Sequence, residues 1–126
     1  MTADRGSASV YVLAAAAVVL LAGEAGATVG SAVVARHRAA SAADLGALAA
    51  AARVVFGPGS ACVTATRVVH ANGARLDACR FDGPASLVTA SAQPAGPALR
   101  WGRASVSARA GPVGGIGGPN DRRRAQ

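Results

Sequence analysis

The sequence has little of the side-chain chemistry on which enzymes depend. Its 126 residues include two His, two Cys and six Asp or Glu, which leaves little material for acid–base, nucleophilic or metal chemistry. No Ser, His or Asp lies in an activating motif, and the glycine-rich stretch 114–118 lacks the lysine of a phosphate-binding loop. We therefore predict a non-enzymatic protein with no cofactor and no bound metal.

Lysine and aromatic residues are also scarce. All 13 basic residues are Arg, and aromatics make up 3% of the chain although hydrophobic residues make up 52%. Because Ala and Gly supply much of that apolar fraction, the chain can cover a helix with small side chains but cannot fill a large core. A single small domain is expected. The net charge of +7 fits nucleic acid, a membrane surface or an acidic partner.

One long apolar segment lies near the N-terminus. The run Val10–Leu21 is unbroken, and its continuation to Val34 contains one charged residue, Glu24. Residues 10–34 are long enough to cross a bilayer. Two interpretations stay open: an anchor whose helix continues beyond the membrane, and a secretory signal cleaved after Ala27. A buried helix is less favoured, because the rest of the chain has too little apolar surface to cover it.

Small residues recur along this segment at four-residue spacing. Ala22, Gly26 and Gly30 would form a face on which another helix could approach closely. The charges that flank this segment and the cysteines predict opposite orientations in the membrane. Arg36 and Arg38 favour a cytoplasmic body by the positive-inside rule, whereas the cysteines favour an oxidising space.

The body is predicted to be α+β, with a short helix packed on a small antiparallel sheet. Helix formers continue to Val55, with an apolar stripe at Leu45, Leu48, Ala52 and Val55, so that one rod would run from Val10 to Val55. The stretch 56–59 ends it, and a short helix follows at 61–71. Asn72-Gly73 predicts a turn, and three extended segments are expected at 74–81, 86–92 and 98–108.

Cys62 and Cys79 are an isolated pair in a chain with an export-type leader. A disulfide between them is the simplest interpretation, and it would support a core poor in large side chains. Two buried free thiols are the alternative. A zinc site is disfavoured, because there is no Cys-x-x-Cys pair and His37 and His70 are badly spaced.

Three blocks of the sequence resemble the TadE-like family of small pilin-related proteins, and in particular the subgroup encoded near helicase and secretion genes of high-GC bacteria. These blocks are residues 4–10, residues 33–49, and residues 61–79 from Ala61-Cys62 through Asn72-Gly73 to Cys79. The resemblance implies a pilin-like, single-pass membrane protein with its C-terminal domain outside the cytoplasm. It also implies partners: other pilin-like subunits and the membrane proteins of a Tad-type pilus or secretion apparatus.

In pilin-type substrates a peptidase cuts after a Gly that follows basic residues, and Arg5-Gly6 occupies that place here. Gly6 and Ser7 are thus a candidate leader-peptidase site. Such substrates carry a Glu a few residues into the mature helix, where this chain has Tyr11, and Glu24 is too far along to replace it.

The leading hypothesis is a membrane-anchored, pilin-like component of a pilus-assembly or secretion system. The alternative is a small secreted, disulfide-containing binding protein. A third is nucleic-acid binding through Arg100, Arg103, Arg109, Arg122–Arg124 and Trp101, over which we favour a solvated basic surface near lipid. The expected organisation is a cytoplasmic N-terminus with a candidate leader (1–9), a transmembrane helix (10–34), a helix extension (35–56), an extracytoplasmic α+β domain (57–110) and a disordered basic tail (111–126).

Overall fold

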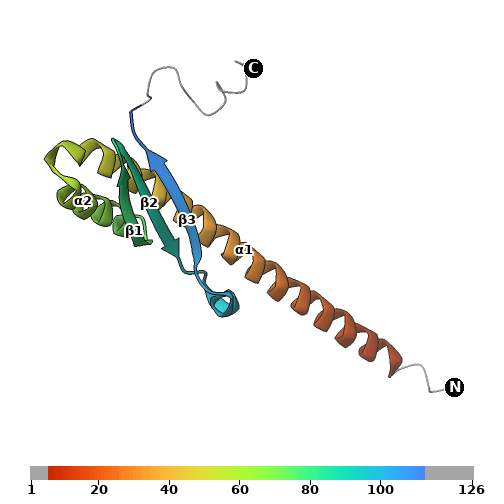
Figure 1. The fold of residues 1–126 in the computed structure, drawn as a ribbon. Coiled ribbons are helices and arrows are strands. Elements are labelled where there is room, and N and C mark those ends of the chain that lie inside the picture. The colour runs from red at the N-terminus through yellow and green to blue at the C-terminus, as the bar shows by residue number, and fades with distance from the viewer. Residues whose placement is uncertain (1–5, 113–126) are drawn as a thin grey trace, which may run out of the picture.

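The computed structural model describes residues 6–112. It contains one very long helix, one short helix and a three-stranded sheet (Figure 1). In chain order the elements are α1 (Ser7–Arg53), the 3₁₀ turn η1 (Val54–Phe56), α2 (Pro58–Ala71), β1 (Arg75–Asp82), β2 (Ala85–Ala92), the 3₁₀ turn η2 (Gly96–Trp101) and β3 (Ala104–Ala110). This is the predicted α+β class with a pilin-like arrangement. The basic end of the predicted tail, 113–126, lies outside the described residues.

The predicted rod is confirmed as one uninterrupted helix. α1 has 47 residues, which at 1.5 Å per residue is about 70 Å. Ala and Leu favour helix, and the glycines at 23, 26, 30 and 46 do not interrupt it, although each lowers helix propensity by about 1 kcal/mol. Packing against the body supports the C-terminal half of this helix, because buried residues begin at Ala35.

A sharp reversal joins the two helices. Gly57 has φ +99°, a conformation that L side chains rarely adopt, and it stands between η1 and α2. Pro58 follows as the first residue of α2, where its missing N–H costs nothing. The second helix therefore begins at Pro58, three residues before the predicted start at Ala61.

The sheet is antiparallel, with strand order β1-β2-β3. Turns at Asn72-Gly73 and Gly83-Pro84 confirm two of the predicted boundaries. The third strand was placed too early: residues 98–101 belong to η2, and β3 begins at Ala104. Gly96 (φ +63°) and Gly102 (φ +85°) bound this 3₁₀ turn, and the local backbone they impose outweighs the weak alternation in the sequence.

Both helices cover the same face of the sheet. α1 packs against β2 and β3, and α2 packs against β1 and α1. The expectation that the short helix would cover the sheet was therefore incomplete, because α1 covers two of the three strands. The opposite face carries polar side chains, including the Thr89–Ser107 hydroxyl pair at 2.8 Å, as is typical of a sheet with one solvated face.

The core is made almost wholly of alanine. The largest fully buried apolar side chains are Val69 of α2 and Val88 of β2. α1 buries a stripe of small residues, namely Ala35, Ala39, Ala42, Ala43, Gly46, Ala47 and Ala50. The predicted stripe of larger residues points the other way, since Leu48 is 60% exposed and Val55 82%. Small residues win because they let the helix lie close to the sheet, where dispersion contacts are strongest.

Candidate functional site

The N-terminal half of α1 stands clear of the body. Every residue from Ser7 to Ala27 is exposed, and in Figure 1 this part of the helix projects as a bare rod beyond the sheet. Thr28, Ser31 and Ala32 are half-buried, and Ala35 is the first residue that is buried. The segment 7–30 is about 36 Å long at 1.5 Å per residue, compared with about 30 Å for the hydrocarbon core of a bilayer.

Apart from Glu24 and a few small polar residues, this projecting segment is apolar. Val10, Leu13, Val19 and Leu21 are among its large exposed side chains. A soluble monomer rarely exposes so much contiguous apolar surface. In the described part of the chain, α1 with its η1 extension is the single helix long and apolar enough to cross a membrane, and none of its most apolar stretch is buried. By length and composition it suits either a membrane anchor or a signal sequence.

The predicted helix-packing face lies within this segment. Ala22, Gly26 and Gly30 are all exposed, and a Cβ at either glycine would meet no other atom within 4 Å. The face is therefore open to a neighbouring helix. Nothing in the described residues fills it, and helix packing there stays a prediction.

The candidate leader-peptidase site lies at the start of α1. Gly6 is the residue before the first helical turn, Ser7 begins the helix, and both are exposed. Arg5 and the residues before it lie outside the described residues. Cleavage between Gly6 and Ser7 stays a prediction.

The predicted disulfide is present. Cys62 of α2 and Cys79 of β1 are bonded, with their Cα atoms 5.9 Å apart. The bridge closes a loop across the Asn72-Gly73 turn and ties α2 to the edge of the sheet. Because the core is mostly alanine, a covalent link here replaces part of the packing that larger side chains would provide.

Of the residues proposed for nucleic-acid contact, Arg100, Trp101 and Arg103 lie at or beside η2, but Arg109 lies apart from them. Arg103 precedes β3 and Arg109 lies near its other end, so about 20 Å of strand separates them. Arg109 donates to a carboxylate oxygen of Asp82 at 3.1 Å. Arg122–Arg124 lie outside the described residues. A single phosphate-binding surface is therefore not visible in the described residues.

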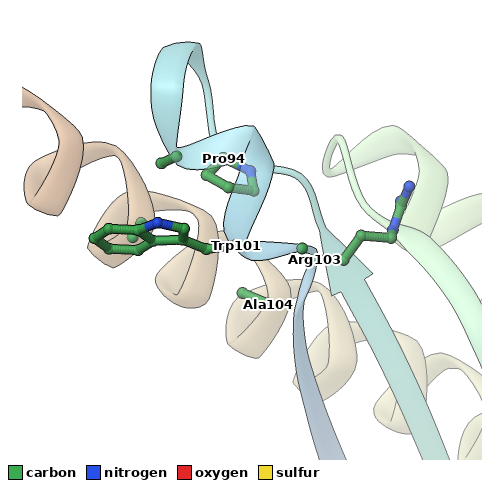
Figure 2. Close-up of a pocket in the computed structure, with 7 residues that line it drawn as sticks. Pro94, Trp101, Arg103 and Ala104 are labelled. Atoms are coloured by element: carbon green, nitrogen blue, oxygen red, sulfur yellow. The ribbon is translucent and has the colours of Figure 1, made fainter.

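The η2 turn lies where α1 leaves the body, a placement the sequence analysis did not anticipate. The Ser31 hydroxyl on α1 lies 3.1 Å from the Ala95 carbonyl oxygen, immediately before η2. A hollow of about 130 Å³ opens between the two, lined by Ala32, Pro94, Ala98, Trp101, Gly102, Arg103 and Ala104. Figure 2 shows Trp101 lying across α1 while Arg103 extends away from it. The Trp101-Gly102 pair that ends η2 is the sequence feature from which this turn could have been predicted.

This hollow does not have the character of a small-molecule site. Its volume is well below the roughly 300–1,000 Å³ of typical ligand pockets, and Arg103 is its one charged lining residue. In the described residues no three His, Cys, Asp or Glu side chains lie close enough to hold a metal ion. His37 and His70 are both exposed and lie on different helices.

Comparison with known proteins adds one match. The model of the family described as "Putative Flp pilus-assembly TadE/G-like" matches residues 6–53, which is α1 together with its preceding residue. No curated protein and no solved structure matches the chain significantly. The matched segment contains both the exposed apolar half of α1 and the alanine stripe that packs against the body. Over this N-terminal helix, the chain is similar to the TadE/G-like family.

Proposed function

We propose that this protein is a membrane-anchored, non-enzymatic, pilin-like component of a pilus-assembly or secretion system. The observation that carries the proposal is the division of α1 into two halves. The N-terminal half is mainly apolar and is exposed from Ser7 to Ala27, whereas the C-terminal half forms one wall of the body. One continuous helix thus joins a lipid-compatible segment rigidly to a folded domain.

The family match supports the system to which the protein is assigned, because its printed description refers to Flp pilus assembly. We place residues 10–34 in the membrane and the body on its outer side. The disulfide supports this orientation, since such bonds persist in oxidising compartments. Its proposed partners are other pilin-like subunits and the membrane proteins of the same apparatus. We expect its gene to lie near helicase and secretion genes.

Sequencing the N-terminus of the mature chain tests the proposal, together with membrane fractionation. A chain that begins at Ser7 or Met1 and sediments with membranes supports an anchored protein. Labelling with a membrane-impermeant maleimide, before and after reduction, reports the side on which the cysteines lie. A freely soluble full-length chain with two reduced thiols would overturn the proposal, as would gene neighbours unrelated to secretion or pilus assembly.

A secreted protein is the second candidate, and one observation favours it. Every residue of α1 before Thr28 is exposed, so cleavage after Ala27 would leave the packing of α1 on the sheet in place. A mature N-terminus at Thr28 in the culture medium would establish this alternative.

A further inference from the structure

The η2 turn lies at the level where the membrane would end, if the proposed anchor is correct. Of the proposed membrane segment 10–34, roughly the first 20 residues span the hydrocarbon core, so its last turn, 31–34, lies in the interfacial region. Ser31 at the start of that turn is the residue whose hydroxyl approaches Ala95 just before η2. η2 also lies at the end of the body nearest the bare rod (Figure 1). A bilayer around this segment would therefore reach the underside of the body at η2.

The side chains of η2 suit the boundary between headgroups and hydrocarbon. Trp101 is 69% exposed and Leu99 47%, although both are large and apolar. Tryptophan concentrates at this depth of a membrane, because its ring is apolar and its indole N–H stays hydrated. Two exposed apolar side chains beside the emerging helix would lose their contact with water there.

The charged residues within η2 and next to it along the chain are all arginine. Arg100 and Arg103 are exposed, and residues 93–110 contain no Asp or Glu. Arg36 and Arg38 lie on α1 just above the apolar segment. Arginine near a bilayer surface is attracted to lipid phosphate, most strongly where the lipids are anionic.

We propose that η2 is a second membrane contact, in which Leu99 and Trp101 rest in the interfacial region of the outer lipid surface and Arg100 meets lipid phosphates. This rests on the proposed anchoring of α1 and adds to it. A helix alone can slide and tilt in a bilayer. A second contact beside it fixes how far the helix emerges and which side of the body faces the lipid.

Trp101 is the single tryptophan of the chain, so its fluorescence reports this contact directly. The full chain is reconstituted into vesicles of phosphatidylcholine and phosphatidylglycerol in equal parts. The lipids are unlabelled, brominated near the carbonyl end of the acyl chain, or brominated near its methyl end. We expect a blue shift of the emission and a loss of intensity with bromine near the carbonyl end, but little loss with bromine near the methyl end.

Two variants locate the membrane and the far end of the body. Trp101→Phe combined with Tyr11→Trp reports insertion of α1 itself, and bromine should quench it. Trp101→Phe combined with Phe56→Trp places the probe at the distal end of α1, at a position also 69% exposed, and bromine should not quench it.

The outcomes separate this inference from the proposed function. Quenching at position 11 without quenching at Trp101 would overturn the η2 contact and leave the anchor standing. A blue shift of Trp101 that bromine does not affect would show a protein partner instead, and would also overturn it. Absence of quenching at both positions would overturn the anchor and the inference together.

The charge contribution has its own control. Arg100→Glu should reduce quenching of Trp101 in these vesicles, because it replaces attraction to anionic lipid by repulsion. Arg67→Glu makes the same change at an exposed position on α2 and should have no effect. Equal quenching in both variants would overturn the assignment of Arg100 to lipid phosphate.

Discussion

Gly46 of α1 lies directly against Val69 of α2. A Cβ at position 46 would be 2.7 Å from Val69 Cγ2 and 3.3 Å from Val88 Cγ1, both of them on fully buried side chains. Glycine at this position is what allows the two helices and the central strand to meet. The core is therefore stabilised by the close approach of these elements rather than by large side chains.

Gly46→Val is therefore expected to destabilise the body. Overfilling a packed core costs about 1–3 kcal/mol, and Val69 is stiff because it is β-branched and helical. Urea denaturation followed by circular dichroism, with the full chain in mild detergent, measures the loss. Gly59→Val is the matched control: Gly59 is helical and a Cβ there meets nothing within 4 Å, so the change should stay within about 0.5 kcal/mol. Equal effects at both positions would contradict this view of the core.

Removing the disulfide should weaken the same domain. Cys62 and Cys79 are 17 positions apart, and closing a loop of that size contributes about 3 kcal/mol in the chain-entropy model. We expect Cys62→Ala combined with Cys79→Ala to lower the free energy of unfolding by about 2–4 kcal/mol. A reducing agent should lower the midpoint of unfolding of the native chain and leave that of the double variant unchanged. Sensitivity of the double variant to reductant would point to a different cause.

Ser86 makes a buried hydrogen bond that should be measurable. Its hydroxyl donates to the Ala47 carbonyl oxygen of α1 at 2.7 Å and is itself fully buried. Ser86→Ala removes the link between β2 and α1, at a cost of about 1 kcal/mol. Ser107→Ala serves as the control, because the hydroxyl it removes bonds Thr89 in an exposed position and water can take its place. The two variants should differ in thermal midpoint, and a larger effect at Ser107 would count against the assigned role of Ser86.

The small-residue face of the bare helix gives a prediction that separates folding from assembly. Gly26→Leu fills the open face near Ala22 and Gly30, where a Cβ meets no atom of the described residues within 4 Å. The thermal midpoint of the body should therefore stay the same. If another helix packs there, crosslinking or energy transfer between copies or partners in membranes should fall, because the backbones can no longer approach closely.

Ala17→Leu provides the comparison, since position 17 lies on the opposite side of α1 by helical periodicity and is also exposed. It should leave association unchanged. Equal loss of association in both variants would indicate a general effect of bulk in the membrane rather than a specific packing face.

The sequence determined the local features of this protein. A run of helix formers with one charge between Gly6 and Ala35 specified a long apolar helix. Gly57 and Pro58 specified the reversal after it, Asn72-Gly73 specified the turn into the sheet, and the isolated cysteines specified their pairing. Each of these features depends on the backbone preference or chemistry of the residues themselves and needs no tertiary contact to specify it.

Only the tertiary structure decided which side of α1 is buried and where η2 lies. In a helix composed largely of Ala, periodicity favours the few large residues, and Leu45 and Leu48 marked the wrong face. Burial went instead to Ala39, Gly46 and their neighbours, because a helix can lie close to a sheet only through its smallest side chains. The contact between Ser31 and Ala95 joins residues 64 positions apart, and it arises from the way the sheet folds back along the helix.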